Sequence, residues 1–289
     1  MKIAVASGKG GTGKTTVSLN LYYFIEKFWN KNVRLIDCDV EEPNDILFFA
    51  SAVKTSHSEV FQQIPEIDTS KCTFCRKCDD WCEFNAISIV KNLEFAEVNP
   101  DLCHSCGACV EACNFGAITE HPKPLGTISY FETGFGNGLT EGRLKVGSSM
   151  QTSLIKEVKK ATTNSVEIII YDAPPGTSCP VVETVADADF IILVTEPTPF
   201  GLHDLKIMLE LLMNMQKPFG VIVNKAGLGS RDVYHFLNEN NVEILGEIPF
   251  TKEYAGNYAS GKILENISTE IENIYRSIIE KLEVKIAVL

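Results

Sequence analysis

The sequence predicts a doubly wound α/β domain, with a mostly parallel sheet, that is interrupted by a small inserted α+β module. Three observations predict this fold class. Short β-branched runs alternate with amphipathic helical stretches, a glycine-rich phosphate loop follows the first run, and a cysteine pattern occurs twice in the middle of the chain. The 289 residues are enough for about two domains with a sizeable core.

The strands of the main domain are expected where β-branched and other apolar residues are concentrated. They cover Lys2–Ala6, Val33–Asp37, Val166–Asp172, Phe190–Thr195, Phe219–Asn224 and Val242–Ile248. Helices are expected between them, where apolar residues recur every three or four positions. They cover Lys14–Phe28, Ser153–Thr162, Leu202–Met215, Ser230–Asn240 and Ser268–Leu282. This alternation is typical of a parallel sheet with helices on both faces.

The first strand leads into a phosphate-binding loop of the P-loop type. The loop consists of Gly8, Lys9, Gly10, Gly11, Thr12, Gly13, Lys14, Thr15 and Thr16. Glycines allow backbone N–H groups to surround phosphates at the helix N-terminus, where the peptide dipoles also favour an anion. We expect Lys14 to contact the β- and γ-phosphates and the Thr15 hydroxyl to ligate Mg²⁺.

Two other segments place carboxylates at the ends of predicted strands. The second strand ends in Asp37-Cys38-Asp39, and a later strand ends in Asp172, which Ala173-Pro174-Pro175-Gly176 follows. Aspartates in such positions often cap helices. Because the phosphate loop follows a neighbouring strand, however, a role in binding Mg²⁺ and in catalysis is favoured for Asp39 and Asp172.

The early Lys9 of the loop and these two segments resemble the MinD/ParA/nitrogenase-iron-protein/Mrp group of ATPases. The resemblance implies a P-loop NTPase that forms a homodimer across ATP, with Lys9 reaching the nucleotide of the other subunit. It also implies that Asp172 holds Mg²⁺ through water and that Asp39 positions the attacking water. Asn224 and Pro249 resemble the family's adenine-binding residues, although Asn224 alternatively serves as a turn residue at a strand end.

The cysteine pattern forms a tandem repeat. Cys72, Cys75, Cys78 and Cys82, with Ala86-Ile87 behind them, recur 31 residues later as Cys103, Cys106, Cys109 and Cys113 with Ala117-Ile118. Prolines at 65, 122 and 124 mark the limits of the repeat. The expected domains are therefore residues 1–64 and 122–289, which together form the ATPase domain, and the insert 65–121.

The spacing C-x₂-C-x₂-C-x₃-C resembles that of bacterial ferredoxins. The resemblance implies two [4Fe–4S] clusters, each held by three close cysteines and the fourth cysteine of the other copy. The first set is Cys72, Cys75, Cys78 and Cys113, and the second set is Cys103, Cys106, Cys109 and Cys82. Zinc is the alternative metal, although zinc sites usually pair two C-x₂-C units around a longer loop. The usual proline after the fourth cysteine is replaced by Glu83 and Asn114.

Two cysteines lie outside the repeat. Cys38 is expected to be a buried structural residue. Cys179 lies seven residues after Asp172, in the region where the nitrogenase iron protein carries a ligand to a cluster that bridges its dimer. That cluster needs a second cysteine from each subunit, and none occurs around Gly147-Ser148-Ser149, which argues against a bridging cluster here. The alternative is that Cys179 is a small residue packed behind the loop that follows Asp172.

The composition restricts the expected partners and location. Twenty-six lysines and arginines against 38 aspartates and glutamates give a net charge of −12, with no basic run, which argues against nucleic-acid binding. No apolar stretch reaches the roughly 18 residues of a membrane span, and the N-terminus does not resemble a signal peptide. We therefore expect a cytoplasmic protein without a membrane anchor.

Over the whole chain, the sequence resembles MinD-superfamily ATPases that carry an inserted ferredoxin domain. This implies an enzyme that hydrolyses MgATP and couples its nucleotide state to electron transfer through two clusters, serving a redox partner, a metalloenzyme or its maturation factor. One alternative is an Mrp-type cluster carrier, although Thr251–Leu264 lacks the family's C-x-x-C pair. The other is a MinD/ParA-like spatial switch, although the polar face of Ile267–Val284 is mostly acidic.

Overall fold

Residues 1–161, 166–265 and 267–286 are described by a computed structural model, in which the chain divides into two compact units. Unit 1 comprises Met1–His57, Ile128–Arg143 and Ile155–Leu289. Unit 2 comprises Ser58–Thr127 and Leu144–Leu154 and contains the repeated cysteines.

The central sheet has the strand order β11-β10-β9-β1-β8-β2-β7-β6-β3 among the described residues. Its strands are β1 (Lys2–Ala6), β2 (Val33–Asp37), β3 (Val53–Ile67), β6 (Ile118–Glu132), β7 (Leu139–Leu144), β8 (Ile168–Asp172), β9 (Phe190–Thr195), β10 (Phe219–Ala226) and β11 (Ile244–Pro249). The pairs from β11 through β2 to β7 are parallel. The predicted α/β fold with a mostly parallel P-loop NTPase sheet is thus confirmed for the main part of the chain.

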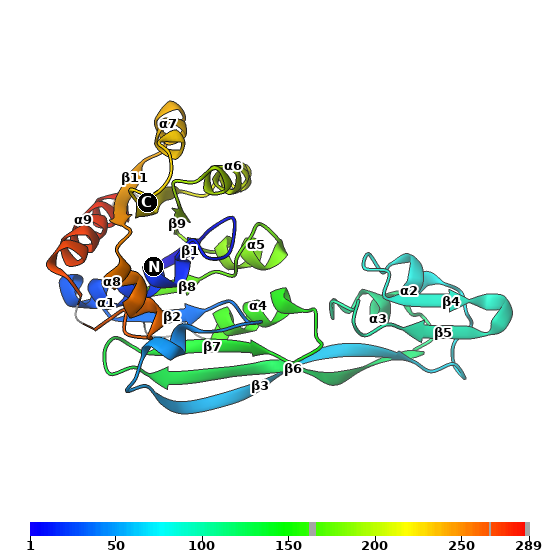
Figure 1. The fold of residues 1–289 in the computed structure, drawn as a ribbon. Coiled ribbons are helices and arrows are strands. Elements are labelled where there is room, and N and C mark those ends of the chain that lie inside the picture. The colour runs from blue at the N-terminus through cyan, green and yellow to red at the C-terminus, as the bar shows by residue number, and fades with distance from the viewer. Residues whose placement is uncertain (162–165, 266, 287–289) are drawn as a thin grey trace. The chain divides into compact units, whose positions relative to one another are not determined.

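Helices cover both faces of the sheet, and all of them lie in unit 1 except the first residues of α4, which belong to unit 2. They are α1 (Lys14–Trp29), α4 (Gln151–Ala161), α5 (Cys179–Val185), α6 (Pro199–Asn214), α7 (Asp232–Glu239), α8 (Lys252–Ala259) and α9 (Thr269–Ile286). Helices α1 and α9 lie on one face of the sheet, and α5 and α6 lie on the other (Figure 1). The five predicted helices are all present, although Thr162, the predicted end of α4, lies outside the described residues.

The apolar core of unit 1 lies between the sheet and the pair α1 and α9. Phe24 of α1 and Tyr275 of α9 are fully buried and stack with ring centroids 5.4 Å apart. Leu282 lies two turns after Tyr275 on α9. It is also fully buried and belongs to the same core cluster. These contacts fix the helix that begins at the phosphate loop against the rest of the domain.

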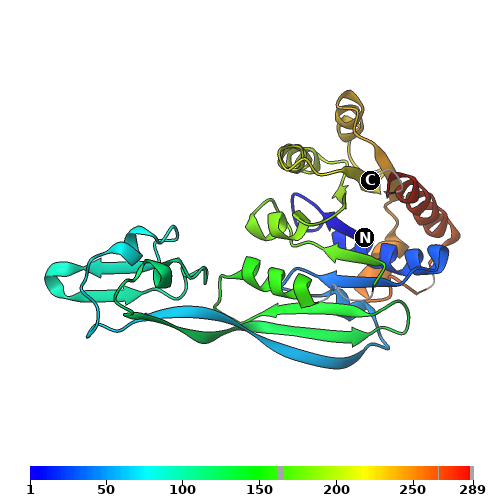
Figure 2. The ribbon, with the colours of Figure 1, turned by 180° about the vertical axis from the view of Figure 1, so that it is seen from behind.

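Unit 2 retains the sequence repeat in its backbone. Helices α2 (Lys77–Asp80) and α3 (Ala108–Ala112) begin 31 residues apart and lie side by side, next to the antiparallel pair β4 (Ile87–Val90) and β5 (Phe95–Val98) (Figure 2). Left-handed backbone also recurs at this interval, with positive φ at Phe74 and Ser105, at Arg76 and Gly107, and at Asn85 and Gly116. The two copies therefore have the same local conformation.

The boundaries of the units differ from the expected domain boundaries. Pro65 lies inside β3, and Pro122 and Pro124 lie inside β6, so these prolines do not end the strands. Proline lacks an N–H group but is tolerated on edge strands such as β3, or where its nitrogen faces away from a partner. The sequence patterns missed β3, β6 and β7, because their residues are largely polar, and also the short helices α5 and α8.

Replacing Leu282 with alanine should lower the free energy of unfolding by about 2–5 kcal/mol, because it leaves a cavity in the core beneath α9. Val284 lies on the same helix but is 68 % exposed, so Val284→Ala is a matched control with an expected change below about 0.5 kcal/mol. Chemical denaturation of both variants measures the difference. Equal losses would show that α9 does not pack as described.

Candidate functional site

Strand β1 lies between β8 and β9 in the sheet. The loop that joins β1 to α1 therefore begins at the carboxyl end of these parallel strands. Ligands bind at this edge in doubly wound sheets, where the connections diverge to opposite faces. Gly13 has a φ of 96°, and a side chain there would overlap Asn224. A side chain on Gly8 would lie 2.6 Å from the backbone of Asp204. Both positions therefore require glycine, as the phosphate-loop motif predicts.

Asp172, at the end of β8, is joined directly to the first turns of α1. Its two carboxylate oxygens accept hydrogen bonds from the Thr15 hydroxyl at 2.7 Å and from the Ser18 hydroxyl at 2.8 Å. Burial raises the pKa of Asp172, whereas the nearby Lys14 and these two hydroxyls act in the opposite direction. The two residues that we expected at Mg²⁺, Thr15 and Asp172, thus lie together.

Asp37 and Asp45 lie with Asp172 in a buried cluster of carboxyl groups. Asp37 accepts backbone N–H groups from Asp39, Asn44 and Asp45 at 2.8–3.1 Å, which holds the loop after β2. Burial and the neighbouring carboxyl groups raise the pKa of both Asp37 and Asp45 well above the ordinary value. Neither carboxyl oxygen of the fully buried Asp45 has a hydrogen-bond partner among the described residues.

Mg²⁺ prefers carboxylate and hydroxyl oxygens, often with water between, and the Asp172 carboxylate and the Thr15 hydroxyl are groups of this kind. The sequence patterns missed Asp45, although it directly follows Pro43-Asn44 in the segment that resembles the family's first switch. Asp39 is half-buried near Lys14 and Asp172, and its burial raises its pKa. Its proposed role in positioning water remains a prediction.

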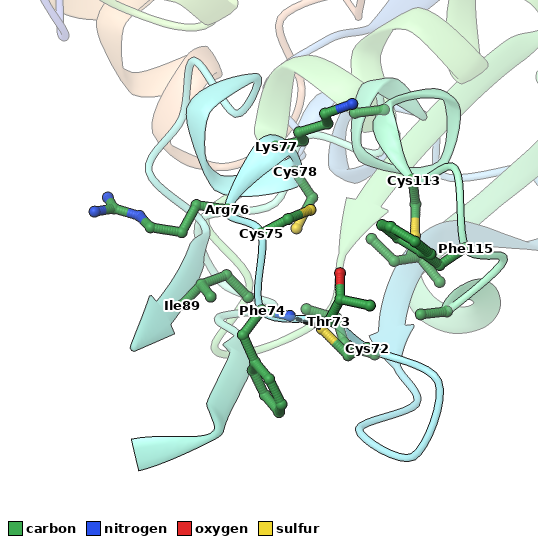
Figure 3. A pocket seen from close by; sticks show the side chains of 14 residues that line it. Cys72, Thr73, Phe74, Cys75, Arg76, Lys77, Cys78, Ile89, Cys113 and Phe115 are labelled. Atoms are coloured by element: carbon green, nitrogen blue, oxygen red, sulfur yellow. Dashed lines mark hydrogen bonds between the residues drawn. The ribbon is translucent and has the colours of Figure 1, made fainter. Parts of the chain in front are cut away.

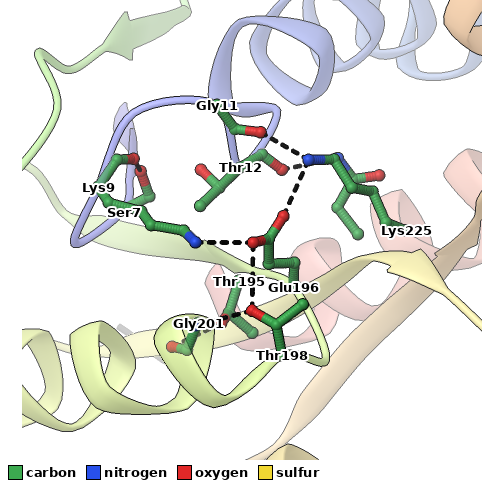
Figure 4. A network of polar contacts seen from close by, with 10 residues as sticks. Ser7, Lys9, Gly11, Thr12, Thr195, Glu196, Thr198, Gly201 and Lys225 are labelled. Atoms are coloured by element: carbon green, nitrogen blue, oxygen red, sulfur yellow. Dashed lines mark hydrogen bonds and ion pairs between the residues drawn. The ribbon is translucent and has the colours of Figure 1, made fainter. Parts of the chain in front are cut away.

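Lys9, the lysine expected to act on the other subunit, is held within its own chain by Glu196. Its Nζ lies 2.7 Å from Glu196, which also pairs with Lys225 at 2.8 Å (Figure 4). Lys225 in turn donates to the carbonyl oxygen of Gly11 at 2.8 Å. Burial alone would raise the pKa of Glu196, but Lys225 and Lys9 together lower it. The sequence patterns missed both Glu196 and Lys225.

A pocket beside the phosphate loop contains the two residues expected at the adenine. Asn224 and Pro249 line it, and it encloses about 730 Å³ of space, part of it open to solvent. Asn224 donates from Nδ2 to the Thr12 carbonyl oxygen at 2.7 Å. The remaining wall includes Tyr254 and Tyr258 of α8, a helix that the sequence patterns did not predict. The pocket offers apolar rings and a polar amide, which suits a flat heteroaromatic base.

The eight repeated cysteines surround two separate hollows in unit 2, of about 340 and 350 Å³ including open space. Hollow 1 is lined by Cys72, Cys75, Cys78 and Cys113, whose side chains Figure 3 shows around a common space. Hollow 2 is lined by Cys82, Cys103, Cys106 and Cys109. Each hollow is thus lined by three close cysteines of one copy and the fourth cysteine of the other. The resemblance to ferredoxins implies the same grouping, and the role of these cysteines as ligands stays a prediction.

The thiol groups of each hollow affect one another. Burial raises the pKa of Cys78, and the nearby Cys72 and Cys113 act in the same direction. Burial likewise raises the pKa of Cys109 to about 11, together with Cys103. At the exposed Cys75, a backbone N–H from Lys77 lowers the pKa.

No group of three or more His, Cys, Asp or Glu side chains in the described parts of the chain converges to hold a single metal ion. This finding concerns sites with one ion, such as the zinc alternative. In a [4Fe–4S] cluster each cysteine ligates a different iron, so the sulfur atoms need not converge on one point. The clusters themselves remain a prediction. Cys38 is buried as expected, whereas Cys179 is exposed at the first position of α5.

Comparison with known proteins identifies the main fold. Residues 3–264 match the model of the CobQ/CobB/MinD/ParA nucleotide binding domain. The chain belongs to this family. It is 34 % identical over 284 residues to the uncharacterized protein MJ0578 of Methanocaldococcus jannaschii. The alignment covers 98 % of this chain and 96 % of that protein.

Solved structures with the same fold include MinD proteins. The septum site-determining protein MinD of Pyrococcus horikoshii, in complex with Mg-ADP, has a TM-score of 0.57 at 19 % sequence identity. The match covers 97 % of this chain and 95 % of the MinD chain. The chain matched in the MinC:MinD cell division protein complex of Aquifex aeolicus has a TM-score of 0.54 at 18 % sequence identity. The match covers 98 % of this chain and 95 % of that chain. These structures show the shared fold, and the family model identifies the chain as a nucleotide-binding protein of the CobQ/CobB/MinD/ParA family. The inserted ferredoxin domain is not confirmed by these comparisons.

No helix among the described residues is both long and apolar enough to cross a membrane.

Replacing Lys14 with alanine should abolish the stabilisation of the protein by MgATP, because this buried ammonium group is the cation expected at the β- and γ-phosphates. For the wild type, ligand at 100 times its Kd should add about 2.7 kcal/mol to the free energy of unfolding. Thermal unfolding with and without MgATP measures this gain. Lys54→Ala, at an exposed lysine outside the loop, is the control and should keep the full gain. An undiminished gain in Lys14→Ala would contradict the assignment.

Proposed function

We propose that this protein is an ATP-driven switch of the MinD/ParA kind whose unit 2 holds two [4Fe–4S] clusters and transfers electrons to a redox partner, a metalloenzyme or its maturation factor. The family match and the geometry at the phosphate loop support the ATP-driven part. The arrangement of eight cysteines as two sets of four around two hollows supports the redox part. This arrangement is the single observation that carries the proposal beyond the family.

The cysteines of hollow 1 and hollow 2 fit one [4Fe–4S] cluster each, in number and in chemistry. Backbone N–H groups already donate to their sulfur atoms, from Phe74 to Cys72 and from Ser105 to Cys103, both at 3.4 Å. Such hydrogen bonds favour a sulfur that carries negative charge. When bound, the clusters would supply sites that gain and lose single electrons.

In unit 1, the chain's residues would position ATP and water for hydrolysis. Lys14 would bind the β- and γ-phosphates, and Thr15 and Asp172 would hold Mg²⁺, whose charge would stabilise the negative charge of the phosphates. Asp39 orients a water molecule whose oxygen bonds to the γ-phosphorus as the bond to the β–γ bridging oxygen breaks, giving ADP and phosphate. Lys9 would leave Glu196 and reach the nucleotide of a second copy, where its charge stabilises the transferred group.

A MinD/ParA-like switch without electron transfer is the second candidate. The likeness to MinD structures favours it, since one of them is a complex of MinD with a partner protein. On this alternative, nucleotide state would control partner binding, and unit 2 would serve as a docking element. The comparisons favour this second candidate, because the family match and the solved structures concern the nucleotide-binding domain and do not confirm the ferredoxin domain. The distinction depends on whether redox state and nucleotide state are coupled.

The Mrp-type cluster carrier is the third candidate, and Thr251–Leu264 contains no cysteine pair to support it.

Cys75→Ala should halve the iron content of anaerobically reconstituted protein, from about eight to about four iron atoms per chain, because alanine cannot ligate iron. ATP hydrolysis should remain at the wild-type level. Cys75 is exposed, so its loss should not unfold unit 2, and the equally exposed Cys179→Ala is the matched control. Iron content that is unchanged in Cys75→Ala, or absent from the wild type, would refute the cluster assignment.

The coupling itself is tested by anaerobic redox titration followed by EPR, with and without MgATP. If nucleotide binding and reduction are coupled, each must affect the other, so the reduction potentials should shift when MgATP is present. Lys14→Ala should show no shift while keeping its iron. Potentials that MgATP leaves unmoved in the wild type would favour the switch without electron transfer.

A further inference from the structure

We infer that the two cysteine sites differ in reduction potential and that hollow 1 accepts an electron more readily than hollow 2. This inference rests on the proposed function, since it requires clusters at both sites. It follows from the side chains that line the two hollows. These can be compared position by position, because the copies of the repeat are 31 residues apart and share their backbone conformation.

Most lining positions are equivalent in the two hollows and carry uncharged residues in both. Phe115 corresponds to Phe84, Ala117 to Ala86, and Ile118 to Ile87. The exposed cysteines Cys75 and Cys106 also correspond to each other. The residue types at these equivalent positions therefore do not distinguish the hollows.

The charged positions differ between the hollows. Hollow 1 is lined by Arg76 and Lys77, whose counterparts in hollow 2 are Gly107 and Ala108. Hollow 2 is instead lined by Glu120, and Ile89 is the counterpart in hollow 1. Figure 3 shows Arg76 and Lys77 next to Cys75 and Cys78, with the charged ends of both side chains pointing away from the sulfur atoms.

The residues after the fourth cysteines add to this difference. Glu83 follows Cys82 of hollow 2, whereas the neutral Asn114 follows Cys113 of hollow 1. Arg76 is paired with Asp79 at 2.9 Å, which reduces its effect, so Lys77 is the main positive charge at hollow 1. Among the charged residues that line the hollows, Lys77 is thus the cation at hollow 1 that has no ion pair with any described residue, and Glu120 is the carboxylate at hollow 2.

The direction of the difference follows from the charge that reduction adds. A cluster that gains an electron becomes more negative, so a nearby cation stabilises the reduced form and raises the potential, while a nearby carboxylate lowers it. One contact acts the other way: the Ala86 N–H donates to Cys82 of hollow 2 at 3.3 Å. A single neutral dipole has a smaller effect than the opposed full charges of Lys77 and Glu120.

The difference in reduction potential would set the order in which electrons occupy the two sites of unit 2. A one-electron carrier that reduces unit 2 loses one electron, and that electron settles at hollow 1. A second electron would occupy hollow 2, which then becomes the stronger reductant of the two. The site that donates at the lowest potential is therefore the one held by Cys82, Cys103, Cys106 and Cys109.

Anaerobic redox titration with dithionite, followed by EPR at pH 8 so that histidines are neutral, tests the inference. The wild type should be reduced in two resolved steps. Cys75→Ala should remove the step at higher potential, and Cys106→Ala should remove the step at lower potential. Both cysteines are exposed, so neither change should unfold unit 2.

Charge variants test the cause. Lys77→Gln should lower the upper potential alone, and Glu120→Gln should raise the lower potential alone. Lys91→Gln and Glu94→Gln change exposed residues of unit 2 outside both hollows and should move neither step. All four positions are exposed, so the variants should fold as the wild type does.

The outcomes separate this inference from the proposed function. Two clusters that titrate as one step, or a Cys75→Ala variant that lacks the lower step, would overturn the inference while leaving the clusters in place. Equal shifts of both steps in Lys77→Gln would also overturn it. Wild-type protein that takes up no iron would overturn the proposed function, and this inference with it.

Discussion

The arrangement of the ATP site depends on Asp172, which joins the end of β8 to the beginning of α1. Its hydrogen bonds to Thr15 and Ser18 fix the helix whose N-terminus carries the phosphate loop, and they do so from the strand next to β1. A buried carboxylate is costly unless it is hydrogen-bonded or paired. The same groups that satisfy Asp172 in the protein alone are thus those that would surround Mg²⁺ when nucleotide is bound.

The charged groups of the site interact with one another within the chain. Lys9 and Lys225 are paired with Glu196, and burial together with the neighbouring carboxyl groups raises the pKa of Asp37 and Asp45. Nucleotide and Mg²⁺ would change both parts at once, because phosphates compete for the lysines and a divalent ion relieves the carboxyl cluster. This is a simple physical basis for a switch that responds to nucleotide.

Unit 2 depends on a different constraint, the local backbone of a repeated cysteine loop. Positive φ values at equivalent positions turn each chain segment so that three cysteines face one hollow, and the fourth cysteine comes from the other copy. Each hollow is thus built from both copies of the repeat. The residues that differ between the copies, such as Lys77 and Ala108, make the two hollows chemically unequal.

The sequence by itself determined the phosphate loop and the alternating strands and helices, because each depends on local spacing. The division of the eight cysteines into two sets came from the resemblance to ferredoxins. The grouping at hollows 1 and 2 agrees with that division. Only the tertiary structure brought Asp45 to Asp172, Glu196 to Lys9 and Tyr254 to Asn224, since these residues are far apart along the chain or lie in segments without a motif. It also placed Pro65, Pro122 and Pro124 inside long strands. Strand pairing and the convergence of strand ends are long-range effects, which no local pattern of residues encodes.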